Sequence, residues 1–119
     1  DLDNDRPIYV QLMEKIRLDI VSGVYRPGDK LPSVRDLALE AAVNPNTMQK
    51  ALSELERNGL VYSQRTSGRF ITEDENMLKQ LKTELAAEQI KQFFEKMKQL
   101  GFEDSETLAL VKKAVKEES

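Results

Sequence analysis

The sequence has no cysteine and no histidine among its 119 residues. It therefore cannot form disulfides, offer a thiolate nucleophile, build a zinc finger or use an imidazole for acid–base catalysis. It also lacks a phosphate loop and a G-x-G-x-x-G motif. No apolar run reaches the ~18 residues that a membrane-spanning helix requires. These absences predict a protein that is not an enzyme and has no cofactor, no metal site and no membrane segment.

Positive charge is not in excess either. The chain has 18 Lys and Arg against 21 Asp and Glu, a net charge of −3, which is unfavourable for binding nucleic acid. The distribution is uneven, because all seven arginines lie in residues 1–72. Arginine makes forked contacts with phosphate and guanine, so nucleic-acid contacts are expected in that part. The asymmetry alone is equally compatible with an ordinary Lys/Glu-rich helical tail.

The N-terminus lacks the features of a secretory signal. Its first five residues, DLDND, are acidic where a signal peptide would be basic. Hydrophobic residues make up 39% and charged residues 33% of the chain, as is typical of a folded, soluble protein. A cytoplasmic location is expected.

Periodicity and punctuation predict a mainly α fold with a small β-hairpin: a winged helix-turn-helix domain over residues 6–73, then a two-helix dimerisation region over 74–119. The expected helices cover residues 7–22, 33–41, 45–58, about 75–100 and a short segment from 104 or 105, and the expected strands cover residues 60–64 and 69–72.

The second and third helices carry clear start signals. Ser33 is a predicted N-cap, and Asn44 is another, with Pro45 in the first helical position. Apolar residues then recur at i, i+3, i+4 and i+7 and define a buried face, made of Met48, Ala51, Leu52 and Leu55.

The opposite face of the third helix carries small polar and cationic side chains. Asn and Gln can bond adenine in two places, Lys can reach guanine, and recognition helices use their N-terminal residues on base edges. The predicted base contacts are Asn46, Thr47, Gln49 and Lys50. An ordinary solvated face is the alternative, but such a face would more often mix charges, and no Glu occurs from residue 44 to residue 53.

Two flanking segments are candidates for backbone contacts. Ser33 and Arg35 open the second helix, whose N-terminal amides can bond a phosphate, although Arg35 could instead pair with Asp36 or Glu40. The hairpin tip offers Arg65, Gly68 and Arg69 for the DNA backbone or the minor groove. Taken alone, a basic hairpin tip is weak support.

The C-terminal part has a wide apolar stripe that two helices cannot bury by themselves, and a large exposed patch indicates a partner surface. A second copy related by a twofold axis is expected to cover it, although the tail could instead fold back on its own domain. The predicted dimerisation residues are Leu78, Leu81, Leu85, Ile90, Phe93, Phe94, Met97 and Leu100.

Three segments, PIYVQL at 7–12, GVYRPGDKLPSVRDLA at 23–38 and VNPNT at 43–47, closely resemble the GntR family of bacterial transcription regulators. The resemblance implies a winged helix-turn-helix, with DNA contacts at the matching positions, which are Ser33, Arg35, Asn44, Asn46, Thr47, Gln49 and Gly68. The tail looks like that of the YtrA-type subfamily of compact dimeric repressors. The wing departs from the family pattern, because Thr66 stands where a first glycine is usual and a β-branched residue adopts φ > 0 poorly.

The resulting hypothesis is a dimeric, sequence-specific repressor that reads the major groove with helix 45–58 of each copy. Its partners would be a double-stranded DNA operator with twofold-related half-sites, a second copy and, as an open question, a small-molecule effector of unknown identity. The alternative is a winged-helix module that docks on another protein and does not bind DNA.

Overall fold

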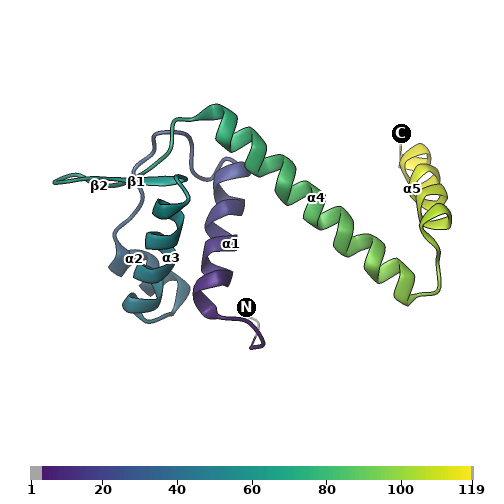
Figure 1. Ribbon diagram of the computed structural model, residues 1–119, viewed down its shortest axis with the longest axis horizontal. Coiled ribbons are helices and arrows are strands. Elements are labelled where there is room, and N and C mark those ends of the chain that lie inside the picture. The colour runs from purple at the N-terminus through teal and green to yellow at the C-terminus, as the bar shows by residue number, and fades with distance from the viewer. Residues whose placement is uncertain (1–3, 119) are drawn as a thin grey trace. The chain divides into compact units, whose positions relative to one another are not determined.

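The computed structural model describes residues 4–118. These residues form five helices and one antiparallel hairpin: α1 (Ile8–Val21), α2 (Val34–Ala41), α3 (Pro45–Arg57), β1 (Val61–Gln64), β2 (Gly68–Ile71), α4 (Glu75–Gln99) and α5 (Asp104–Glu118) (Figure 1). The predicted fold class, mainly α with a small hairpin, is confirmed.

The predicted helix caps are present. The Ser33 hydroxyl accepts a hydrogen bond from the Asp36 N–H at 3.1 Å. The Asn44 side chain accepts one from the Asn46 N–H at 2.7 Å, and Pro45 follows in the first turn of α3. Each cap satisfies an amide that the helix leaves without an internal partner, so the sequence fixes where both helices begin.

The turn between α2 and α3 contains a backbone conformation that the sequence did not reveal. Ala42 has φ 56° and ψ 45°, in the left-handed region where glycine is the usual residue. Its N–H and that of Val43 return to the end of α2, with Val43 N–H bonded to the Ala38 carbonyl at 2.9 Å. This tight closure turns the chain directly from α2 into α3.

The hairpin pairs Val61 with Ile71 and Gln64 with Gly68, so the return strand begins one residue before the predicted Arg69. A third, extended segment lies along the free edge of β2. The Leu31 N–H bonds to the Arg69 carbonyl and the Ile71 N–H to the Asp29 carbonyl, both at 2.8 Å. The wing is therefore anchored to the segment that leads into α2.

The core of the N-terminal unit lies between α1, α2, α3 and the base of the hairpin. Helix α3 packs against α1 on one side and α2 on the other, and its end packs against β1 (Figure 1). The predicted inner face of α3 is confirmed, because Met48, Ala51, Leu52 and Leu55 are at most 2% exposed. Burial of this face directs the opposite face of α3 outward.

The chain divides into two compact units, and the division falls after Leu81, inside α4. The expected boundary lay between residues 73 and 74, so the first two turns of α4 belong to the N-terminal unit. Met77 approaches Gly59, with its Cε 3.2 Å from the place where a Cβ would lie. Leu81 is only 8% exposed. Leu81, one of the predicted dimer contacts, is thus already largely buried within a single copy, and its contact with a second copy stays a prediction.

The C-terminal unit, residues 82–119, leaves much of its apolar surface uncovered. Leu85, Phe94 and Met97 are half-buried. Large apolar side chains stay exposed along both helices: Ile90 57%, Phe93 42%, Leu100 72%, Leu108 47%, Leu110 43% and Val115 64%. One molecule alone therefore leaves the predicted wide apolar stripe partly exposed to solvent.

Candidate nucleic-acid interface

The N-terminal half of α3 presents polar side chains outward. Asn46 and Gln49 are exposed and Thr47 is half-buried. The Gln49 side-chain amide donates a hydrogen bond to the Ser53 hydroxyl at 3.0 Å, which orients Gln49 along the helix. These groups have the donors and acceptors that base edges match in the major groove. The structure brings the three predicted residues together on one turn of the helix.

The Lys50 side chain contacts α1. Its Nζ sits 4.1 Å from the centroid of the Tyr9 ring, so the ammonium group rests on the aromatic face of a residue of α1. Tyr9 is 41 positions earlier in the chain, and the helical spacing of Lys50 gave no sign of this contact. The Lys50 ammonium group therefore contacts α1 in this structure, although its position on α3 neighbours those of Asn46 and Thr47.

The start of α2 presents a second set of groups. The Ser33 hydroxyl is the N-cap and accepts a hydrogen bond from the Asp36 N–H, which leaves its own O–H free to donate to a phosphate. The Arg35 side chain is exposed, and no ion pair to Asp36 or Glu40 is present within residues 4–118. This disfavours the alternative in which Arg35 is neutralised on its own helix, and leaves its guanidinium available to an anion.

The wing carries the remaining predicted residues. Arg65 is exposed in the turn, and Gly68 has φ 109°, a conformation that a β-carbon would strain. Outside the glycines, Ala42 is the one positive φ in the described part of the chain. Thr66 therefore has an ordinary negative φ in the wing turn. Of the two positions where the family usually has glycine, only that of Gly68 has a backbone conformation that favours glycine.

Arg69 does not point freely from the wing. Its Nε donates to Glu56 of α3 at 3.3 Å, and the Ser63 hydroxyl donates to the same carboxylate oxygen at 2.8 Å. The Arg69 side chain is only 21% exposed. Sequence reasoning missed Glu56, because contacts between a helix and a hairpin 13 residues away have no periodic signal.

One corner of the N-terminal unit is acidic. Burial raises the pKa of Tyr25, and the nearby carboxylates of Asp19 and Glu40 raise it further. A hydrogen bond and ion pair with Asp19 raise the pKa of Lys15. The backbone N–H of Tyr25 also bonds to the Asp19 carbonyl at 3.1 Å, which holds Tyr25 against the end of α1.

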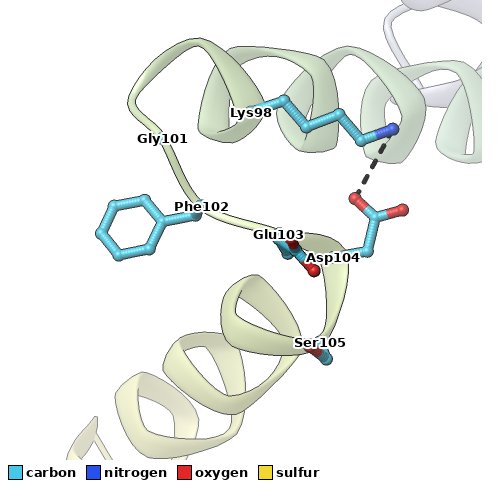
Figure 2. Close-up of a pocket in the computed structure, with 6 residues that line it drawn as sticks. All are labelled: Lys98, Gly101, Phe102, Glu103, Asp104 and Ser105. Atoms are coloured by element: carbon cyan, nitrogen blue, oxygen red, sulfur yellow. Dashed lines mark ion pairs between the residues drawn. The ribbon is translucent and has the colours of Figure 1, made fainter.

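No site for a cofactor is evident in the described residues. A shallow depression of about 520 Å³ lies at the turn between α4 and α5 (Figure 2). Lys98 and Asp104 form an ion pair of 3.7 Å there, and the Phe102 ring points away from it. It lacks the apolar lining typical of ligand pockets. Within residues 4–118 there is no cluster of three metal-ligating acidic side chains and no helix apolar and long enough to cross a bilayer.

Known proteins share this arrangement. The sequence model described as "Bacterial regulatory proteins, gntR family" matches residues 8–71. The HTH-type transcriptional repressor YtrA of Bacillus subtilis (strain 168) is 41% identical over 93 residues, which are 77% of this chain and 72% of that protein.

Two solved structures add to the comparison. A GntR family transcriptional regulator from Listeria monocytogenes has 40% sequence identity and a TM-score of 0.83, with 94% of this chain and 98% of that one covered. The AraR DNA-binding domain in complex with operator ORR3 has 33% identity and a TM-score of 0.51, with 54% of this chain and 77% of that one covered. These relatives are regulators and not enzymes. Since the family model matches more than half of the residues and YtrA aligns over most of the chain, this protein belongs to the GntR family of bacterial regulatory proteins, and it is similar to the YtrA type.

Proposed function

We propose that this protein is a dimeric, sequence-specific DNA-binding repressor. The observation that carries the proposal is the outward face of α3, where Asn46, Thr47 and Gln49 gather at the N-terminal end of a helix held out by its buried side. The operator complex of the AraR domain, which shares this fold, supports DNA as the ligand. The name of YtrA supports repression as the sign of regulation.

The mechanism assigns a separate role to each element. Helix α3 enters the major groove and reads base edges with Asn46 and Gln49. The N-terminus of α2 and Arg35 bind a phosphate and set the register. The wing lies along the backbone or the minor groove, with Arg65 and the Gly68 backbone nearest to the DNA.

Dimerisation is proposed to occur through the C-terminal unit. A single copy leaves Ile90, Phe93 and Leu100 between 42% and 72% exposed, and a twofold-related copy would cover them. Two winged domains would then meet half-sites about 10 bp apart or a multiple of that spacing. An effector could regulate binding only by favouring one arrangement of the dimer over another.

The test of DNA binding has two steps. Selection from random duplexes should yield a palindromic operator, and gel shifts with that operator should then be measured across a salt series. Binding through phosphates predicts that log K falls linearly with log salt. A protein-docking module, the rival class, would show no shift at any salt concentration.

The test of dimerisation is sedimentation of two matched variants. Phe93→Glu places a charge on the exposed stripe of the C-terminal unit and should shift the protein towards monomer. Leu39→Glu makes the same kind of change at a residue of α2 that is 81% exposed, and should leave the dimer intact. Equal sedimentation of wild type and Phe93→Glu would refute this dimer surface.

A further inference from the structure

We propose that Glu56 is a positioning residue that ties the wing to the recognition helix through Ser63 and Arg69, and that Lys30, not Arg69, supplies the cationic contact of this side of the wing with the DNA backbone. The inference rests on the proposed DNA-binding function and concerns which residues carry it.

One face of the sheet is directed towards α3. Ser63 and Arg69 are paired in the register, so their side chains leave the same face. Both donate to the Glu56 carboxylate, at 2.8 and 3.3 Å. Because α3 is fixed by its buried side, this double contact fixes the angle of the wing to the helix that reads the bases.

The Glu56–Arg69 pair is electrically neutral as a unit. A phosphate that approached Arg69 would also approach Glu56, which is 39% exposed. Counterion release depends on the phosphates that a protein neutralises, and a neutral pair neutralises none. Arg69 therefore positions the wing, and it does not add to the electrostatic attraction between the wing and the DNA backbone.

The other face of the sheet carries an unpaired cation. Tyr62 and Phe70 stack there with ring centroids 5.6 Å apart, and Gly68 is on the same side as Phe70. Lys30 forms a β-bridge with Phe70 and lies across Gly68, since its Cε is 3.1 Å from the place where a Cβ would lie.

Lys30 is exposed, and no ion pair or hydrogen bond of its side chain is present in the part of the chain that the structure describes. It also lies three residues before Ser33, the cap of α2. It thus stands between two elements proposed to touch the backbone, the wing glycine and the start of α2. Its charge is free to bind a phosphate at either of them.

The experiment measures how log K depends on log salt, from about 50 to 200 mM. The probes are a random-sequence duplex and the selected operator, with full-length protein. Lys30→Gln removes the proposed contact. Glu56→Gln/Arg69→Gln replaces the neutral ion pair with a neutral pair of amides. Lys112→Gln, on α5, is the control with the same change of net charge as Lys30→Gln.

Lys30→Gln should reduce the steepness of the salt dependence by about 0.9, the value of one phosphate contact. The double variant and Lys112→Gln should keep the wild-type slope. The charge assignment is overturned if Lys30→Gln keeps the wild-type slope, or if the double variant loses as much slope as Lys30→Gln.

The positioning role has its own readout, the ratio of operator affinity to random-duplex affinity. Glu56→Ala removes both hydrogen bonds to the wing and should lower this ratio several-fold, whereas Glu56→Gln keeps an acceptor oxygen and should restore most of it. An unchanged ratio in Glu56→Ala, with wild-type thermal unfolding, refutes the positioning role. If the wild-type protein itself fails to bind either duplex, the proposed function fails, which is distinguishable from failure of a variant.

Discussion

Asn44→Ala removes the side-chain cap of the recognition helix. The Asn44 Oδ1 accepts from the Asn46 N–H at 2.7 Å, and alanine has no acceptor to replace it. The first turn of α3 would then leave one more amide to water, next to the residues proposed to read bases. The substitution should therefore lower the free energy of unfolding and also loosen the first turn of α3, which carries the residues proposed to read bases.

The magnitude follows from measured caps, since replacing a capping Asn with Ala costs about 1 kcal/mol. For a cooperative unit of about 80 residues, this lowers the Tm by about 4–8 °C. The assay is thermal unfolding by circular dichroism, at a fixed protein concentration because dimerisation adds to the apparent stability.

Asn44→Asp is the matched variant. Aspartate caps as well as asparagine and favours the positive end of the helix dipole, so the Tm should not fall. Its carboxylate would face DNA phosphates, so affinity for every duplex should drop. If Asn44→Ala unfolds at the wild-type temperature, or if Asn44→Asp loses as much stability as Asn44→Ala, the capping role is refuted.

Three further substitutions, one of them with a matched control, test other parts of the structure. Ala42→Gly should raise stability by about 0.5 kcal/mol in urea unfolding, because relief of the left-handed strain exceeds the added flexibility of the unfolded chain; a lower midpoint would contradict the strain at φ 56°. Leu55→Ala, at a fully buried side chain, should cost about 2–5 kcal/mol, whereas Leu39→Ala should stay within about 0.5 kcal/mol; equal effects would contradict the assigned core. Lys50→Ala removes the contact with Tyr9 and should lower the free energy of unfolding in urea by about 0.5–1 kcal/mol. Selection from random duplexes should yield the same operator as for the wild type, and a new base preference would show that Lys50 reads DNA.

The helices of the N-terminal unit could be predicted from sequence because their signals are local. Ser33 and Asn44 are capping residues that stand directly before the segments they cap, and both caps form. The inner face of α3 follows from a spacing that only a helix brings to one side. The predicted end of α3 at residue 58 also agrees with the structure, where Asn58 is the C-cap and Gly59 follows with φ 84°.

The features that the sequence did not reveal depend on contacts between elements. Glu56 meets Arg69 across 13 residues, and Lys50 meets Tyr9 across 41. In the sequence, Arg69 and Lys50 looked like exposed cations available to DNA. The left-handed Ala42 was also hidden, because alanine does not indicate a turn in the way that glycine does.

The apolar stripe of the tail shows a different limit. Leu81 and Phe93 fall on the same predicted stripe, but Leu81 is 8% exposed and Phe93 is 42% exposed. Helical periodicity identifies which side chains share a face, but it does not say how far along the helix the chain's own core extends. That point is set by the packing of the first turns of α4 with the N-terminal unit.

The central claim is that the outward face of α3 reads bases, and Gln49→Ala tests it most directly. Its affinity should be measured on the selected operator and on a random duplex at one salt concentration. We predict a loss of about 1–3 kcal/mol on the operator alone, which is about 5- to 150-fold, together with relaxed base preference at one position of each half-site. A loss by the same factor on both duplexes would contradict base reading by this face.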